Sequence, residues 1–259
     1  MSEQVIPWRG RLSGRCFVVT GAASGIGRAC AVEATRQGAA VTLADRDEAR
    51  LTAIAAELED SGADVLSVVT DITDESQCAR MVTAACERFG RLDGAVLSAG
   101  IARHVPILEM SREQWEQMLA VHLTGAFLCL REVSRTMVQQ DCGGSLVYVA
   151  SSVAAGLGPL RQAHYVAAKA GALGLVRAAA RELGPRAIRV NAVSPGFTRT
   201  ELNTALFSDE DVRQRELNTP LGRVAESGDV ADAVMFLLGD GSGFMTGQTL
   251  HVNGGTHMP

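Results

Sequence analysis

Thr20-Gly-Ala-Ala-Ser-Gly-Ile-Gly27 is the stretch that decides the fold of this chain, because it joins a short apolar run to a helical pattern over residues 28–38. Glycines let a chain turn tightly between a strand and a helix and let the backbone approach a ligand closely. The following helix directs unsatisfied N–H groups and the positive end of its dipole at the turn, which suits a pyrophosphate. The spacing Gly-x-x-x-Gly-x-Gly therefore predicts a phosphate-binding turn, although glycines at such a turn can also serve the fold alone.

An acidic residue, Asp45, ends the second apolar run, eighteen residues beyond Gly27. An acid at this place can accept hydrogen bonds from both hydroxyls of an adenosine ribose. Its charge would repel a 2′-phosphate, so Asp45 favours NAD over NADP, while the adjacent Arg46 offers such a phosphate an attraction. The alternative is that Asp45 is an ordinary turn residue at the end of a strand.

Short apolar runs alternate with helical patterns along the chain, which predicts parallel strands joined by right-handed crossovers. Most of these runs are nearly continuous, as in strands that are covered on both faces. The predicted strands are residues 16–20, 40–45, 65–71, 94–98, 145–151, 189–194 and 249–252. Since no linker or internal repeat divides the chain, we predict one domain over residues 1–259, with residues 1–12 as an N-terminal extension. Residues 195–228 are predicted to form an irregular loop or lid over a ligand site.

The composition is that of a globular chain, with 47% hydrophobic and 20% charged residues. A formal net charge of −5 argues against a nucleic-acid partner, which would require clustered Lys and Arg. The six cysteines show no CxxC spacing, so we expect reduced structural thiols. The amino terminus lacks a basic segment followed by an apolar core, and no apolar run is long enough to span a bilayer. We therefore expect a cytoplasmic protein without a membrane or nucleic-acid partner.

Tyr165 and Lys169 are four residues apart, so on a helix they share one face and can act on one substrate atom. A free tyrosine ionises near pH 10, but a nearby positive charge favours the phenolate. Lys169 can supply that charge, and the pair therefore indicates acid/base chemistry. Tyr and Lys at helical spacing also form ordinary surface pairs, so the interpretation depends on the rest of the chain.

Together with Ser152, which precedes Tyr165 by thirteen residues, these motifs resemble the short-chain dehydrogenase/reductase family over roughly residues 10–255. Asp71-Ile72 resembles the acidic step after the third strand of that family, and Pro195-Gly-Phe-Thr-Arg-Thr200 resembles its segment beside the nicotinamide. Val252-Asn-Gly-Gly255 is similar to its closing strand. The resemblance implies an α/β fold with a doubly wound, Rossmann-type sheet of about seven parallel strands and helices on both faces.

The resemblance also implies the role of each site residue. Tyr165 would be the general acid/base, Lys169 would lower its pKa and hold the nicotinamide ribose, and Ser152 would hydrogen-bond the reacting oxygen. The resemblance implies a homo-oligomer, commonly a tetramer. No metal is expected, because His251 and His257 complete no zinc spacing. The predicted contacts of the cofactor, NAD rather than NADP, are Gly21, Ser24, Gly25, Ile26, Gly27, Asp45, Arg46, Asp71, Ile72, Ser98, Ala99, Gly100, Tyr165, Lys169, Pro195, Gly196, Phe197, Thr198 and Thr200.

Two positions depart from the family pattern. Asn-Ala-Gly reads Ser98-Ala-Gly100, which shortens a side chain that usually ties neighbouring strands together. His122, in a helix predicted over residues 113–140, stands where the family usually has a catalytic Asn that positions a water leading to the lysine. A neutral imidazole has one donor and one acceptor and can also titrate near neutrality. We therefore predict that His122 is a modified relay, the alternative being a buried core histidine.

These observations favour an NAD(H)-dependent oxidoreductase that interconverts a secondary alcohol and a ketone by hydride transfer, with a tyrosine as acid/base. Two alternatives remain, an NADPH-dependent reductase of 3-oxoacyl thioesters and a non-catalytic dinucleotide-sensing or scaffold protein. The residues that select the small-molecule substrate are expected in segments 102–108, 153–164 and 197–221. Side chains that suggest its lining are Leu157, Leu160, Leu202 and Leu206, with His104 and His164 as further candidates.

Overall fold

The apolar runs of the sequence pair into one parallel sheet of seven strands, in the order β3-β2-β1-β4-β5-β6-β9. The computed structural model describes residues 12–154 and 161–258. The prediction of about seven parallel strands is confirmed, with strand ends shifted by at most two residues. The strands are β1 (Cys16–Thr20), β2 (Ala40–Asp45), β3 (Val65–Val69), β4 (Gly94–Leu97), β5 (Gly144–Val149), β6 (Ile188–Pro195) and β9 (Thr249–Val252).

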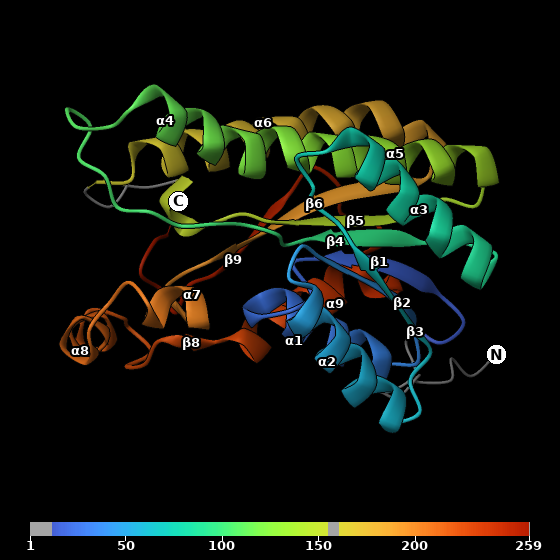
Figure 1. Cartoon of the computed structure of the whole chain (residues 1–259), viewed down its shortest axis with the longest axis horizontal. Helices are drawn as coiled ribbons and strands as arrows, with labels where there is room; N and C mark the ends of the chain where they lie inside the picture. The colour runs from blue at the N-terminus through green and yellow to red at the C-terminus, as the bar shows by residue number, and fades with distance from the viewer. Residues whose placement is uncertain (1–11, 155–160, 259) are drawn as a thin grey trace.

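Helices cover both faces of this sheet (Figure 1). One face carries α3 (Glu75–Phe89), α4 (Arg112–Leu119), α5 (Ala126–Gln140) and α6 (Ala163–Leu183), and the other carries α1 (Gly25–Arg36), α2 (Glu48–Asp60) and α9 (Ser227–Leu238). Alternate residues of a strand point to opposite faces. Val18 of β1 accordingly packs in the core beneath α3, α5 and α6, whereas Val19 packs in the core beneath α1, α2 and α9. The two cores explain why the strand sequences are apolar at nearly every position.

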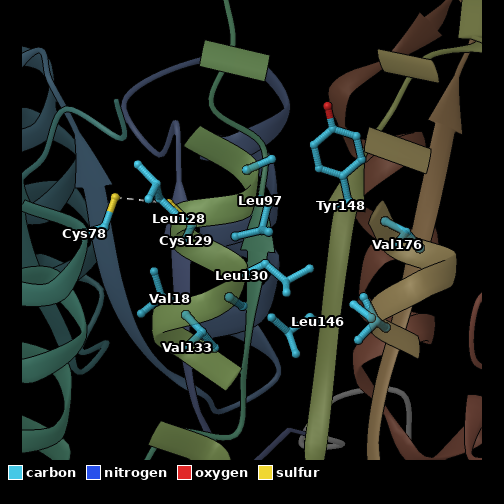
Figure 2. Packing of buried hydrophobic residues seen from close by; sticks show 14 of the residues in the cluster. Val18, Cys78, Leu97, Leu128, Cys129, Leu130, Val133, Leu146, Tyr148 and Val176 are labelled. Atoms are coloured by element: carbon cyan, nitrogen blue, oxygen red, sulfur yellow. Dashed lines mark hydrogen bonds between the residues drawn. The ribbon is translucent and has the colours of Figure 1, made fainter. Parts of the chain in front are cut away.

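The core beneath α3 and α5 contains cysteines as well as aliphatic side chains. Figure 2 shows Leu130 and Val133 of α5 and Leu146 of β5 in this core. Cys78 of α3 and Cys129 of α5 are both buried, and their Sγ atoms lie 3.7 Å apart as free thiols. These thiols join the two helices through packing and a weak hydrogen bond, which agrees with the structural role expected for the cysteines.

The single helix predicted over residues 113–140 is interrupted in the structure. A π-helical turn, Ala120–Gly125, separates α4 from α5 and contains His122. Such turns within α-helices are frequent at functional sites. Gly125 permits close packing here, because a Cβ at this position would lie 2.7 Å from Cδ1 of Ile72. The periodic sequence pattern continues through the π-helical turn, so the pattern alone did not reveal it.

The segment predicted as an irregular lid, residues 195–228, is instead mostly folded. It contains β7 (Thr198–Arg199), α7 (Glu201–Thr204), α8 (Asp209–Leu217) and β8 (Ala225–Glu226), and β7 pairs with β8 in a small parallel sheet. Thr200 caps α7, and Ser208 forms a capping box with Asp211 at the start of α8. The polar residues that resembled loop sequence are therefore helix caps. This segment follows β6, and α7 and α8 lie together at one end of the sheet (Figure 1).

The order of the strands reverses between β1 and β4, and ligands bind outside the carboxyl ends of parallel strands at such a point. The fold therefore places the glycine-rich turn after β1 beside the segment that follows β4. Of the predicted N-terminal extension, residues 1–11 lie outside the described residues. Leu12 belongs to the folded core, since it is buried and its N–H donates to the carbonyl of Gln37 at 3.2 Å. Across the described parts of the chain, no helix combines the length and apolar character that crossing a membrane requires.

Candidate active site

A cavity of about 580 Å³ opens at the carboxyl ends of the strands, and every predicted catalytic and cofactor-contacting residue lies on its wall. The wall has two parts of different composition. The glycine-turn half comprises Gly21, residues 23–27, Asp45 and Asp71, and the tyrosine half comprises His122, Ser152, Tyr165 and Lys169. Residues that are far apart in the sequence thus meet at one place, which is the geometry that a reaction between two bound molecules requires.

The glycine-rich turn packs so closely that its glycines cannot be replaced by larger residues. Gly21 and Gly25 have φ angles of 71° and 52°, in the left-handed region that favours glycine. A Cβ at Gly27 would lie 2.0 Å from the carbonyl oxygen of Gly21. Ser24 precedes the first turn of α1 without capping it through its side chain. The first N–H groups of α1 are therefore available to a ligand, and they lie at the cavity wall together with the positive end of the helix dipole.

The Asp45 carboxylate both holds the glycine-rich turn and lines the cavity. One of its oxygens, Oδ2, accepts a hydrogen bond from the Ala23 N–H at 3.1 Å, and Oδ1 accepts one from the Asp47 N–H at 3.0 Å. Arg46 lines the same part of the wall. The two interpretations of Asp45 are therefore compatible, because the carboxylate stabilises the turn and still has lone pairs for a ribose.

Thr20 performs the strand-tying role that the shortened side chain of Ser98 leaves open. Its hydroxyl accepts hydrogen bonds from the backbone N–H groups of Ser98 and Ala99, at 3.1 and 3.3 Å, and donates to the Val96 carbonyl at 3.4 Å. The end of β1 is thereby fixed to the end of β4. The departure from the family pattern at Ser98 leaves the position of this wall intact.

Tyr165 and Lys169 lie one turn apart on α6, and both face the cavity. The Lys169 Nζ donates to the Val149 carbonyl at 2.6 Å and lies 4.7 Å from the centroid of the Tyr148 ring. Burial lowers the pKa of Lys169 to about 7. Burial also raises the pKa of Tyr165, while a hydrogen bond with the Ser151 side chain acts in the opposite direction. The lowering of the tyrosine pKa expected from the sequence is therefore not found in the protein alone, because burial disfavours the phenolate.

His122 is buried against both the loop after β4 and the tyrosine. Its Nε2 lies 2.7 Å from the Ile101 carbonyl oxygen and 3.1 Å from the Ile101 nitrogen, and its ring meets the Tyr165 ring edge-on at 5.0 Å. The Nδ1 atom is buried and has no hydrogen-bond partner within the described structure. Burial and then the charge of Lys169 lower the pKa of His122 to about 3. The suggestion that His122 titrates near neutrality is therefore wrong, and its relay role remains a prediction for a neutral imidazole.

Three residues that the sequence reasoning did not select also shape the tyrosine half. Tyr148 of β5 donates from its hydroxyl to the His122 carbonyl at 3.1 Å, which holds the π-helical turn in place. Ser151, beside the predicted Ser152, hydrogen-bonds to Tyr165. Arg215 of α8 lines the cavity, with its guanidinium carbon 4.5 and 4.3 Å from the centroids of two phenylalanine rings. A hydroxyl-bearing residue in the middle of an otherwise aliphatic run was the available signal for Tyr148, whereas nothing local distinguished Arg215 from a surface arginine.

The predicted substrate lining is only partly found on the wall. Leu202 lines the cavity and Leu206 does not, while Leu157 and Leu160 lie outside the described residues. His164 is fully buried, and its Nδ1 accepts a hydrogen bond from the Tyr165 N–H at 2.9 Å. It therefore acts as a support for the start of α6 rather than as a wall residue.

The donor set of the cavity fits a dinucleotide. The α1 amides suit a pyrophosphate, Asp45 suits a ribose, and the segment after β6 provides a further wall beside Tyr165 and Lys169. No cluster of three or more His, Cys, Asp or Glu side chains suited to a metal occurs within residues 12–154 and 161–258. The wall therefore combines groups suited to binding a nucleotide with a tyrosine suited to proton transfer.

Comparisons with known proteins agree with this description. Residues 21–257 match the family model described as enoyl-(acyl carrier protein) reductase. The chain is 37% identical to the 3-oxoacyl-(acyl-carrier-protein) reductase FabG of Staphylococcus aureus over 243 residues, which cover 93% of this chain and 97% of that protein. It is 38% identical to L-rhamnose 1-dehydrogenase (NAD(P)(+)) of Azotobacter vinelandii, over 93% of this chain and 96% of that one. Its fold matches a short-chain type dehydrogenase/reductase from Mycobacterium marinum with a TM-score of 0.92 at 33% identity, over 97% of this chain and 98% of the other.

Proposed function

This chain belongs to the short-chain dehydrogenase/reductase family, and from that premise we propose that it is an NAD(H)-dependent oxidoreductase that interconverts a secondary alcohol and a ketone. The observation that carries the proposal is the meeting of Ser152, Tyr165 and Lys169 on the wall of the cavity that also contains the glycine-rich turn. A proton-transferring phenol beside a dinucleotide site is the arrangement that carbonyl reduction by hydride transfer requires.

The dinucleotide is proposed to lie along the glycine-turn half. The first amides of α1 bind its pyrophosphate, Asp45 accepts hydrogen bonds from the adenosine ribose, and Lys169 hydrogen-bonds the ribose next to the nicotinamide. The segment from Pro195 to Thr200 positions the nicotinamide end. When bound, the nicotinamide supplies or accepts the hydride at the substrate carbon.

Tyr165 is proposed to transfer the proton. Burial raises the pKa of this phenol, so it is protonated at neutral pH and can donate to the oxygen of a ketone as that oxygen gains negative charge. Ser152 orients the same oxygen. In the opposite direction the Tyr165 phenolate accepts the proton of the alcohol, and the ammonium of Lys169 stabilises that phenolate.

His122 is proposed to be a positioning residue for the proton path. Its pKa of about 3 keeps the imidazole neutral. Nε2 lies closer to the Ile101 carbonyl oxygen, at 2.7 Å, than to the Ile101 nitrogen, at 3.1 Å, so we assign the proton to Nε2 and leave the other nitrogen as a hydrogen-bond acceptor. That acceptor is Nδ1, the buried atom without a partner in the described structure. The His122 ring contacts the Tyr165 ring, and the charge of Lys169 acts on the imidazole, so a hydrogen bond to Nδ1 would connect His122 with the part of the site that holds both residues.

The direct test is reduction of a panel of ketones with NADH and with NADPH, followed by the loss of cofactor absorbance. We expect turnover with NADH and a lower KM for NADH than for NADPH, because the Asp45 carboxylate repels a 2′-phosphate. Turnover that is faster with NADPH would overturn the cofactor assignment. Tight NADH binding without reduction of any ketone, or oxidation of any alcohol by NAD, would favour the non-catalytic dinucleotide sensor or scaffold.

A second candidate is an NADPH-dependent reductase of 3-oxoacyl thioesters. It is favoured by the similarity to FabG and by the description of the matching family model. Asp45 weighs against it, because its carboxylate repels the 2′-phosphate of NADPH. The net charge of −5 also weighs against it, because the substrate of such an enzyme is presented on an acidic carrier protein. Comparison of acetoacetyl coenzyme A with simple ketones at equal NADPH concentration discriminates the two candidates, since only the thioester reductase prefers the former.

We also propose a homotetramer in the cytoplasm, as the sequence resemblance implied. Trp115 of α4 and Phe127 of α5 are 39% and 41% exposed in the single chain, which provides apolar surface on the helices that such an interface would use. Light scattering measures the mass directly, and a monomer would contradict the proposal.

A further inference from the structure

The wall of the cavity contains a cation that the proposed reaction does not use. Arg215 lies on α8, three residues after the buried Val212, so the two side chains share one helix face directed inward. The guanidinium carbon lies 4.5 Å from the Phe197 ring centroid and 4.3 Å from that of Phe207. Within the described structure the guanidinium forms no ion pair and no hydrogen bond. Two aromatic rings therefore hold this cation at the wall while its N–H donors remain unused.

Contacts between neighbouring residues place Arg215 in the tyrosine half. The Phe207 ring, which Arg215 contacts, also meets the His104 ring at a centroid distance of 5.1 Å. The charge of Arg215 contributes to lowering the pKa of His104. His104 belongs to the loop that begins at Ile101, and Ile101 bonds to His122, whose ring contacts Tyr165. Arg215 and Tyr165 therefore line the same cavity, and the Phe207 ring and the loop after β4 link them.

The acidic side chains of the wall belong to the other half of the cavity. Asp45 and Asp71 accept hydrogen bonds from neighbouring backbone N–H groups, and Asp47 caps α2. Glu201 is near the glycine-rich turn, where its Oε2 lies 3.9 Å from the place of a Cβ on Gly25. None of these four carboxylates pairs with Arg215. Within the described residues, no carboxylate on the wall therefore pairs with Arg215. The acid whose charge acts on this guanidinium is Asp211, one turn earlier on α8 and outside the cavity wall.

His104 provides a second polar group beside Arg215. Its Nε2 is buried and has no hydrogen-bond partner among residues 12–154 and 161–258. Burial, followed by the charges of Arg161 and Arg215, lowers the pKa of this imidazole, so it is neutral when Arg215 is charged. His104 is not on the cavity wall and lies against the Phe207 ring. A single wall cation with a neutral imidazole nearby suits an anion of charge −1 better than a dianion, which usually recruits further cations and helix amides.

We propose that Arg215 binds a carboxylate of the substrate, so that the enzyme interconverts a hydroxy acid and an oxo acid. This inference rests on the proposed function, because the reacting carbonyl must occupy the same cavity. Two parallel N–H···O bonds from a guanidinium fit a carboxylate, and the flanking Phe197 and Phe207 rings keep the guanidinium plane oriented before the substrate binds. Arg215 is then the residue that determines specificity for acids over neutral ketones.

Binding without turnover tests the proposal. The probes are 2-, 3-, 4- and 5-oxo monocarboxylic acids and their methyl esters, titrated by calorimetry into the complex of the enzyme with NAD, in which a ketone cannot be reduced. We expect at least one acid to bind more tightly than its ester by about 10- to 100-fold, as for a charge-assisted hydrogen-bonded pair. Arg215→Met is expected to abolish this preference, so that each acid and its ester bind with similar affinity. Arg215→Lys is expected to restore it in part, because the charge remains but the planar fork is lost.

Arg213→Met is the matched control, since Arg213 belongs to the same helix but is exposed and lines a separate hollow. Loss of the preference for acids in this control, or no such preference in the wild type, would overturn the proposal. Tighter binding of a phosphate monoester than of every acid would also overturn it.

NADH oxidation with the same probes distinguishes failure of the carboxylate site from failure of the proposed function. Reduction of esters without any preference for acids leaves the proposed function standing and this inference wrong, whereas Arg215-dependent binding without reduction of any probe leaves the carboxylate site standing and the proposed function wrong.

Discussion

In the glycine-turn half of the cavity the chain offers mainly backbone, while in the tyrosine half it offers buried side chains. The first half contains helix amides without a side-chain cap, glycines with positive φ at positions 21 and 25, and Gly27, where the backbone leaves no room for a Cβ. The second consists of a tyrosine, a lysine and a histidine, all with pKa values shifted by burial. Backbone donors do not titrate near neutral pH, so their binding depends on shape, whereas the charge of buried titratable groups depends on pH. The comparison therefore predicts different responses to mutation in the two halves.

The burial of the tyrosine half has an energetic consequence as well as a catalytic one. Tyr165 and Lys169 are shifted toward their uncharged forms, because taking a charge out of water is unfavourable without a partner. A ligand that restores hydrogen bonds or opposite charge to these groups recovers part of that free energy. The proposed substrate and dinucleotide both do so, which links binding to the protonation state of the site.

The largest effect is expected from Tyr165→Phe, which removes the proposed proton donor and keeps the ring. We expect kcat to fall by about 10³- to 10⁴-fold, the range of general acid–base catalysis, with NADH affinity nearly unchanged. Steady-state kinetics and fluorescence titration of NADH measure the two quantities. Tyr148→Phe is the control, since it also removes one buried phenol hydroxyl but only the hydrogen bond to His122. Equal losses in the two variants would show that Tyr165 has no special role.

His122→Asn is expected to change how stability depends on pH. The pKa of His122 is about 3 in the folded protein and about 6.5 when the chain is unfolded, so between these values only the unfolded chain binds the proton. Stability is therefore lost as the pH falls from 6.5, by about 3 kcal/mol at pH 4 from this residue alone. The variant lacks that contribution. Chemical denaturation of both proteins at several pH values measures the difference, and parallel stability curves would contradict the burial argument.

These buried groups also show where sequence reasoning reaches its limit. The strands, the glycine-rich turn and the Tyr165–Lys169 pair were predictable, because each depends on a local pattern such as apolar runs, glycine spacing or one helical turn. The pKa of His122 was not predictable, because it depends on how the loop at Ile101 and the side chain of Lys169 surround the imidazole ring. The sequence identified His122 as unusual but could not establish that it is neutral.

The interrupted helix and the folded segment after β6 had different causes. The π-helical turn between α4 and α5 arises from tertiary packing, including the approach of Gly125 to Ile72, while the residue pattern around it stays helical. In segment 195–228 the helix caps Thr200 and Ser208 resemble loop residues in the sequence, because a short helix has little apolar periodicity to distinguish it. The role of Arg215 was not predictable for a different reason. Its aromatic neighbours, Phe197 and Phe207, lie too far away in the sequence to form a recognisable spacing with it.

Gly27→Ala is the variant that tests the glycine-turn half. A single Cβ would lie 2.0 Å from the Gly21 carbonyl, so the turn must open and the α1 amides must move. We expect the affinity for NADH to fall by about 100-fold at every pH tested, because backbone donors do not titrate in this range. Gly228→Ala, at an exposed helix position with no atom within 4 Å of the added Cβ, is the control and should bind NADH normally. Unchanged affinity in Gly27→Ala would contradict the proposed pyrophosphate site.

The smallest expected change comes from Asp45→Ser, which leaves the backbone of the glycine-turn half in place and removes the one acidic side chain proposed to discriminate between dinucleotides. Without the carboxylate, a 2′-phosphate is no longer repelled and Arg46 stands beside it on the wall. NADPH affinity should rise by about tenfold, and NADH affinity should fall modestly because the ribose loses its acceptor. Asp45 also holds the Ala23 N–H, so a serine hydroxyl is chosen to keep an acceptor near the turn. If both affinities fall together, the carboxylate serves the turn alone, and the cofactor preference must come from residues other than Asp45.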